Sequence, residues 1–109
     1  MRLEGIPFAE IEWEKIPLEE RSGERGTARS RTWVTRDIRV RMVEYSPGYL
    51  ADHWCSKGHI VFCVRGEFVS THKDESAHPI RQGMVYLVGD NEQPHRSSSE
   101  AGATLFIVD

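Results

Sequence analysis

The chain has 109 residues, of which 39% are hydrophobic and 28% are charged, and this is enough for one compact globular domain. Its formal net charge of -3 argues against a nucleic-acid partner, because phosphate binding needs a basic surface. No apolar run reaches membrane-spanning length, and the first residues carry no apolar signal segment. We therefore expect a cytoplasmic protein without nucleic-acid or membrane partners.

Residues 1–26 are expected to form an N-terminal arm packed on the body. Pro7 and Pro17 would break any long helix, and the charged stretch 19–26 is typical of a loop. Four apolar residues could anchor the arm: Phe8, Ile11, Trp13 and Ile16. These anchors also favour a homodimer in which the arm contacts the second subunit.

From residue 27 onward, short segments with a period of two are separated by Gly, Pro and Asn turns, which predicts an all-β sandwich or small barrel over 27–109. Arg65-Gly66 is expected to form a hairpin turn. The arginines between Arg25 and Arg41 are interpreted as a solvated strand face. The expected strands cover 28–34, 38–43, 49–55, 59–64, 67–72, 84–88, 95–98 and 103–108.

Three possible metal ligands, His53, Cys55 and His59, lie close together in the sequence, and a fourth, His95, follows much later in the chain. In a strand, His53 and Cys55 would point to the same face, with Asp52 on the other, and a tight turn at Gly58 would bring His59 beside them. A buried group of imidazoles and a thiol needs partners, which a metal ion supplies. Nothing in the spacing alone decides whether His95 joins them.

These residues resemble the first motif of the small single-domain cupins. The spacing from His53 through Cys55 and His59 to Gly66 matches that motif, and Gly48 stands one residue closer to His53 than is usual. In the second motif Gly83 and His95 fit the ends, Gly89 takes a Pro position and Ser99 takes an Asn position. The resemblance covers about residues 39–108. The segment 49–59, with its Asp-His-Trp-Cys sequence, also resembles a bacterial cupin subgroup with a DHCW motif.

The resemblance implies a cupin-type jelly-roll β-barrel that holds a metal in its mouth, with His53, Cys55, His59 and His95 at the ligand positions. In this chain a Cys replaces a His and a His replaces a Glu. Such ligands suit a divalent transition metal, with zinc favoured and iron, nickel or copper as alternatives.

Three functions remain open at this stage. The first is a small-molecule metalloenzyme of the oxygenase, isomerase or hydrolase type. The second is a non-catalytic module whose three histidines and Cys55 close around a structural ion, and the third is a metal-free barrel that binds a small ligand. Cys55 is the residue that separates the first two, because a fourth protein ligand would close the site, whereas Cys55 as a neighbouring free thiol would leave an open centre.

Overall fold

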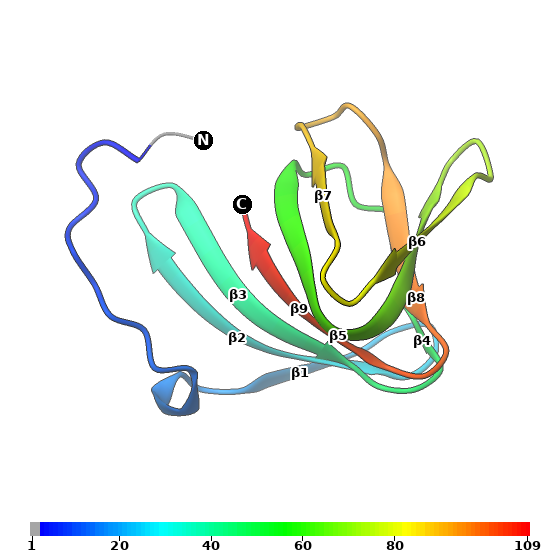
Figure 1. Cartoon of the computed structure of the whole chain (residues 1–109), viewed down its shortest axis with the longest axis horizontal. Helices are drawn as coiled ribbons and strands as arrows, with labels where there is room; N and C mark the ends of the chain where they lie inside the picture. The colour runs from blue at the N-terminus through cyan, green and yellow to red at the C-terminus, as the bar shows by residue number, and fades with distance from the viewer. Residues whose placement is uncertain (1–2) are drawn as a thin grey trace.

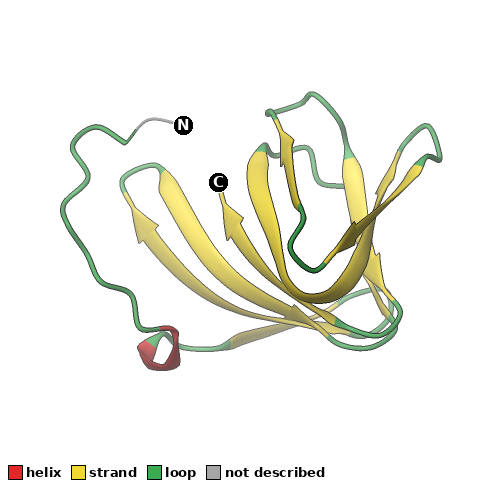
Figure 2. Cartoon of the chain, in the orientation of Figure 1, coloured by secondary structure: helices red, strands yellow, loops and turns green. Residues whose placement is uncertain are grey.

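Strands make up most of this structure, a computed structural model that describes residues 3–109 (Figures 1 and 2). One short 3-10 helix, η1, precedes them. The elements are η1 (Trp13–Lys15), β1 (Glu19–Ser22), β2 (Thr27–Thr35), β3 (Ile38–Tyr45), β4 (Tyr49–Leu50), β5 (His59–His72), β6 (Ala77–Arg81), β7 (Val85–Val88), β8 (His95–Ser99) and β9 (Ala103–Val108). Within the described residues, no helix is long and apolar enough to cross a membrane. The all-β prediction is confirmed.

All strand pairs are antiparallel, in the order β1-β2-β3-β9-β5-β8-β4, with β6 and β7 also paired to β5. The first half of β5 pairs with β9 and β7, and its second half pairs with β6 and β8. Figure 1 shows β5 curving from one side of the sheet to the other. The single sheet therefore curls into the jelly-roll barrel that the sequence predicts.

The hairpin expected at Arg65-Gly66 is wrong, because β5 runs straight through it as one strand of 14 residues. The register against β9 shifts between Cys63 and Arg65, which is a β-bulge. Gly66 has a φ of 78°, and a side chain there would collide with the carbonyl oxygen of Gly102. The glycine therefore lets β5 bend against its neighbour rather than reverse direction.

The interior is filled by apolar residues that alternate along the strands, as a period of two requires. Phe68 and Leu105 are each 1% exposed, and Cys63 is fully buried. Both cysteines are free thiols. The core comprises Val43, Val61, Cys63, Phe68, Ile80, Ala103, Leu105 and Ile107.

The N-terminal segment touches the outer face of the sheet at η1. The Trp13 ring packs edge-on against Phe106 at 6.3 Å between centroids, and Arg31 donates to the carbonyl oxygens of Trp13 and Ile16 at 3.0 and 2.6 Å. Phe8 is 89% exposed. The division into an arm over 1–26 and a barrel over 27–109 stays a prediction, and its first two residues lie outside the described part.

The loop expected over residues 19–26 is wrong for its first half, where β1 pairs with β2. All four residues of β1 are exposed and polar, so no hydrophobic alternation revealed the strand. Backbone pairing at the edge of a sheet does not require an apolar face. As a consequence, Arg21 belongs to the sheet and contributes to the cavity described below.

Candidate metal centre

The chain leaves the sheet after Leu50 and returns to it at Cys55, so the strand expected over 49–55 is wrong beyond its first two residues. Ala51 still donates to the carbonyl oxygen of Ser97 at 3.0 Å, and the chain then bulges outward. Cys55 and His95 then exchange two backbone hydrogen bonds of 2.8 and 2.9 Å. This isolated bridge fixes Cys55 directly beside His95.

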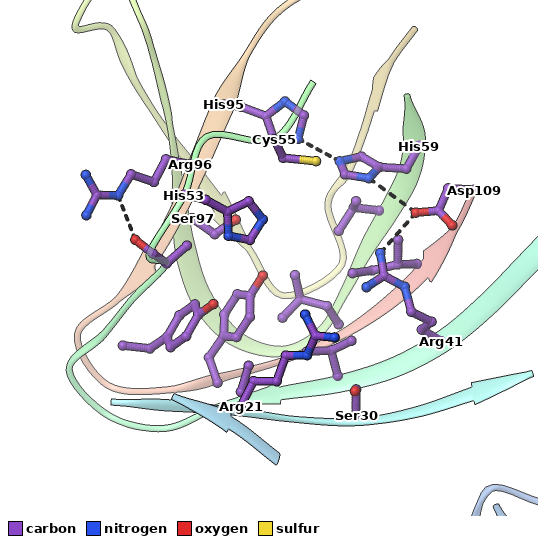
Figure 3. Close-up of a pocket in the computed structure, with 18 of the residues that line it drawn as sticks. Arg21, Ser30, Arg41, His53, Cys55, His59, His95, Arg96, Ser97 and Asp109 are labelled. Carbon is purple, nitrogen blue, oxygen red and sulfur yellow. Dashed lines mark hydrogen bonds and ion pairs between the residues drawn. The ribbon is translucent and has the colours of Figure 1, made fainter. Parts of the chain in front are cut away.

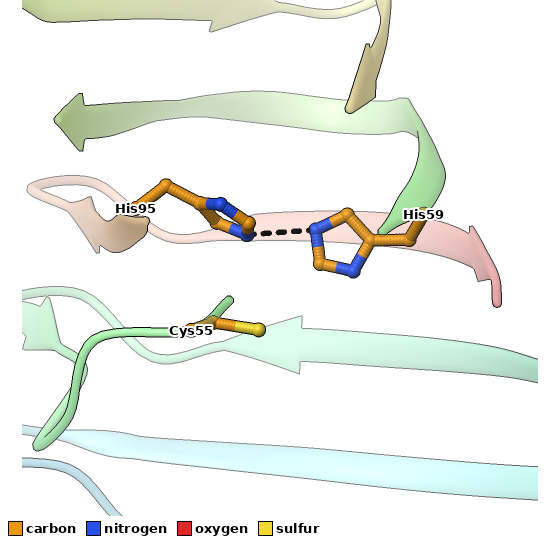
Figure 4. Close-up of side chains that lie close together, drawn as sticks. All are labelled: Cys55, His59 and His95. Atoms are coloured by element: carbon orange, nitrogen blue, oxygen red, sulfur yellow. Dashed lines mark hydrogen bonds between the residues drawn. The ribbon is translucent and has the colours of Figure 1, made fainter. Parts of the chain in front are cut away.

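Three of the four predicted ligands come together here. The ligand atoms of Cys55, His59 and His95 all lie within 4.8 Å of one another (Figure 4). His59 opens β5, His95 opens β8, and their Nε2 atoms are 2.9 Å apart. The side chain of His59 is 7% exposed and His95 is 4% exposed, so both imidazoles are removed from bulk water.

The surroundings of the two imidazoles orient their ring nitrogens. His95 Nδ1 lies 2.7 Å from the carbonyl oxygen of Gln93, which can only accept, so Nδ1 carries a proton, and in the neutral imidazole Nε2 then carries a lone pair. His59 Nδ1 makes no hydrogen bond but faces Asp109 Oδ2 at 3.7 Å. A proton on His59 Nδ1 would interact favourably with this carboxylate. The lone pair of the neutral ring would then be on Nε2 and point toward His95.

The protonation preferences of the three side chains fit this arrangement. Burial, and then the neighbouring His95, lower the pKa of His59 to about 4, so this imidazole is neutral at pH 7. The interaction with His95 lowers the pKa of the Cys55 thiol, and the same interaction raises the pKa of His95. Cys55 is therefore disposed to become a thiolate, the form that binds metals.

A transition-metal ion fits this donor set. Two imidazole lone pairs that face each other at 2.9 Å repel unless a proton or a cation lies between them. Nitrogens bound to one ion at about 2.1 Å lie roughly 3.0 to 3.4 Å apart for bond angles of about 90° to 110°, close to the distance seen here. Two imidazoles and a thiol suit zinc, iron, nickel or copper better than magnesium or calcium. Cys55, His59 and His95 could therefore bind a metal.

His53 lies outside this group. Its side chain is 68% exposed, and its Nδ1 atom lies 2.7 Å from Asp52 Oδ1. The expectation that Asp52 and His53 point to opposite faces is wrong, because the two belong to an irregular loop and contact each other. The four-residue ligand set as a whole stays a prediction.

The three grouped ligands border a cavity of about 420 Å³ inside the barrel (Figure 3). His53, Tyr86, Asp109 and four arginines also line it. The arginines are Arg21, Arg39, Arg41 and Arg96. Arg39 and Arg41 share the inward face of β3 with buried Val43, so the interpretation of this basic cluster as a wholly solvated face is wrong for these two residues.

Two residues outside the predicted ligand set contact His59. The Tyr86 hydroxyl lies 3.0 Å from His59 Nε2, on the inward face of β7. Asp109 follows β9, and its fully buried carboxylate contacts Arg39 at 2.8 Å and Arg41 at 3.0 Å. Burial raises the pKa of Asp109, but the two arginines outweigh it and hold that pKa below its usual value. Asp109 is two residues beyond Ile107 and four beyond Leu105, which both point inward from β9. This alternation could have indicated that the Asp109 side chain also points into the barrel.

No protein-family model matches the sequence, and a search of curated proteins found no match either. Several solved structures share the fold. A polyketide cyclase from Streptomyces resistomycificus is 13% identical with a TM-score of 0.77, and the match covers 94% of this chain and 78% of the cyclase. A predicted oxalate decarboxylase from Thermotoga maritima is 15% identical with a TM-score of 0.74, covering 92% of this chain and 96% of the other.

An RmlC-like cupin from Shewanella frigidimarina is 15% identical with a TM-score of 0.73, and the match covers 94% of this chain and 90% of that protein. At these identities the likeness concerns the fold and not the activity. The strand order, the curled sheet and these neighbours agree. The chain therefore has the jelly-roll β-barrel fold of these cupin structures.

Proposed function

We propose that this protein is a metal-dependent enzyme that acts on a small molecule inside its barrel. Cys55, His59 and His95 would hold a divalent transition metal, zinc in the first place, with iron, nickel or copper as alternatives. The observation that carries the proposal is the position of these ligands. Their donor atoms lie within 4.8 Å of one another at the wall of a cavity of about 420 Å³.

The geometry favours an open centre over a closed structural one. A closed tetrahedral site needs four protein ligands, and His53, the remaining member of the predicted set, is exposed and bonded to Asp52. A metal with an open position polarises a bound oxygen or lowers the pKa of bound water. The non-catalytic closed site is therefore the less supported alternative.

The neighbouring residues have definable roles in such a centre. The Gln93 carbonyl holds His95 in the tautomer that ligates through Nε2, and Asp109 stands behind His59 as an orienting carboxylate. Tyr86 places a hydroxyl 3.0 Å from His59 Nε2, where it can donate to or accept from a molecule in the cavity. The buried walls limit access of bulk water to this corner.

Two structural neighbours are enzymes of small-molecule chemistry by name, a polyketide cyclase and a predicted oxalate decarboxylase. They support an enzymatic role on the same fold without identifying a reaction for this chain. Their substrates differ, so the reaction must be argued from this chain's own cavity.

Three further expectations belong to this proposal. A homodimer is supported by exposed apolar side chains, with Leu87 72% and Val85 48% exposed on β7. A cytoplasmic location is supported by the two free thiols. Membership of the DHCW subgroup is supported by residues 52–55, which form the loop that delivers Cys55 to His95.

Metal content and coordination of the purified protein test the proposal. We expect one transition metal ion per chain. The X-ray absorption spectrum should give a metal–sulfur distance of about 2.3 Å. Cys55→Ser and His59→Ala should lose the metal. His78→Ala, on the exposed β5–β6 hairpin, is the matched control and should retain it.

His53→Ala separates the open centre from the closed one. Retention of the metal by this variant would support three protein ligands and an open position. Loss of the metal together with a spectrum of three nitrogens and one sulfur would establish the closed site instead. Absence of any stoichiometric metal, with stability unchanged by a chelator, would refute the metal proposal altogether.

A further inference from the structure

Two arginines of β3 meet the same acidic residue at one corner of the cavity. Arg39 donates to both carboxylate oxygens of Asp109, at 2.8 and 3.1 Å, and Arg41 donates to Oδ2 at 3.0 Å. Two guanidinium groups thus share a single carboxylate whose side chain is fully buried. Counting the ion pairs of residues 3–109, this corner has one more guanidinium group than carboxylates.

Arg41 also keeps an unused donor. Its Nε atom is buried and has no hydrogen-bond partner among the described residues. Leaving a buried donor on a charged group unpaired is unfavourable, so such donors are normally satisfied by protein, water or a bound ligand. Arg41 lines the cavity, and an acceptor located there would complete its hydrogen bonding.

Arg21 brings another positive charge to the cavity from β1. The ion pairs of the described arginines involve Arg29, Arg39, Arg41 and Arg96 and do not include Arg21. Its side chain lines the cavity from β1, and Figure 3 shows it pointing inward, as Arg41 does from β3. β2 lies between these two strands in the sheet.

The other polar groups of the lining leave the two arginines available. Arg96 is already paired with Glu24 and donates to the carbonyl oxygen of Ala51 at 2.7 Å. Asp52 is bonded to His53, which lowers the pKa of its carboxyl; Arg21 contributes to the same lowering but forms no ion pair with Asp52 among the described residues. Glu19, the other inward charge on β1, is exposed and forms no ion pair with Arg21 or Arg41 among the described residues. Between the arginines, β2 presents the neutral side chains of Ser30 and Thr32 to the cavity.

We infer that the small molecule taken into this cavity carries a carboxylate or phosphate group, and that Arg21 and Arg41 bind this group. The inference rests on the proposed function, since it names the substrate class of the same cavity. Guanidinium groups form short, charge-assisted hydrogen bonds with the paired oxygens of such anions. The hydroxyl groups of Ser30 and Thr32 can bind polar groups in the remainder of the small molecule. The anion would pair with Arg21 and give the buried Nε atom of Arg41 an acceptor.

Calorimetric titration with three small probes tests this inference. Malonate carries carboxylates, inorganic phosphate is the alternative anion, and malonamide is the neutral analogue of malonate. We expect the metal-loaded protein to bind at least one anion and not malonamide, with malonate or phosphate preferred according to the natural group. Arg21→Gln should weaken anion binding about 10-fold, as expected for the loss of a charge-assisted hydrogen bond.

Arg29→Gln is the matched control, because Arg29 is an exposed arginine on β2 that does not line the cavity. It should change anion binding less than about twofold, since exposed charges away from a site contribute little. Arg41→Gln, checked for folding by circular dichroism, should weaken binding at least as much as Arg21→Gln. Equal weakening by Arg29→Gln and Arg21→Gln, or no binding of either anion, would overturn the inference.

Repeating the titration after chelation separates this inference from the metal proposal. Arginine-dependent anion binding by metal-free protein supports the anion site even if no metal is ever found. Anion binding that requires zinc and is indifferent to Arg21→Gln and Arg41→Gln would mean that the probe binds the metal alone. That result would sustain the metal centre and refute the arginine site.

Discussion

Strands β3, β5 and β9 build both ends of the barrel interior. One end is lined by apolar side chains and the other by polar and chargeable ones. At one end Val61 pairs with Ile107, and Cys63 pairs with Leu105, all apolar and buried. One step further along the same inward faces, the side chains become polar and chargeable. The change occurs from Val43 to Arg41 on β3, from Val61 to His59 on β5, and from Ile107 to Asp109 at the end of β9.

The difference shows that one sheet can hold a stabilising core and a reactive cavity in separate parts of its inward face. The apolar end is close-packed and stabilises the curled sheet, whereas the polar end keeps an open cavity and groups whose pKa values depart from normal. Neither end needs a separate element, because alternation along the strands directs both sets of side chains inward. Changes at the two ends should therefore affect different measurements.

The largest expected effect is at the apolar end. Phe68 is 1% exposed and packs near Tyr45 and Tyr86, with centroids 6.1 and 6.2 Å away. Phe68→Ala should lower the free energy of unfolding by about 3 to 5 kcal/mol, because a large buried ring leaves a cavity. Denaturant titration measures this loss. Phe62 lies on the same strand but is 37% exposed on the outer face, so Phe62→Ala should lower the free energy of unfolding clearly less. An equal loss would contradict the assignment of the stabilising core to the inward face.

Metal removal should act at the polar end. If zinc binds as proposed, a free concentration 100-fold above the dissociation constant raises the free energy of unfolding by about 2.7 kcal/mol. Thermal melting with zinc and with a chelator measures the shift. Amide hydrogen exchange should show added protection around His59 and His95 rather than around Phe68. The His59→Ala variant should show no zinc-dependent shift, and a shift of normal size would contradict the assigned ligands.

Asp109 should increase the zinc affinity of the site without binding the metal itself. Asp109→Asn removes the negative charge 3.7 Å from His59 Nδ1 and should weaken zinc affinity about 10- to 100-fold, as for other orienting partners. Competition with a chromophoric chelator gives the affinity. Asp74→Asn, on an exposed turn, is the control and should leave it unchanged. Normal zinc affinity in a folded Asp109→Asn protein would show that the carboxylate serves only Arg39 and Arg41.

Regular alternation made the fold and part of this site predictable from the sequence. The strands around Val43, Leu105 and Met84–Val88 follow a period of two or stand between strong turn signals, so their positions were expected to within a few residues. His59 begins such a strand, and the motif spacing that resembles cupins placed Cys55 and His95 with it. These three residues are the ones that the structure groups.

The remainder depended on irregular backbone, which periodicity does not describe. Residues 52–54 bulge out of the sheet, so strand parity misplaced His53 relative to Cys55. β1 is polar throughout, so Arg21 gave no hydrophobic signal of belonging to the cavity. Gly66 looked like a turn residue because a glycine at positive φ serves a hairpin and a β-bulge equally well.

The smallest expected effect tests whether the apolar end tolerates polarity at all. Ser70 is 2% exposed, and its hydroxyl has no hydrogen-bond partner among the described residues. Because a buried unpaired hydroxyl is unfavourable, Ser70→Ala should leave the free energy of unfolding unchanged or raise it by less than about 1 kcal/mol. Ser99→Ala is the matched control, since the Ser99 hydroxyl is also buried but donates to the Glu67 carbonyl oxygen at 2.7 Å. It should destabilise by about 1 kcal/mol. A clear loss in Ser70→Ala would mean that this hydroxyl binds an internal water or ligand, and that the polar chemistry of the barrel reaches further along β5 than His59.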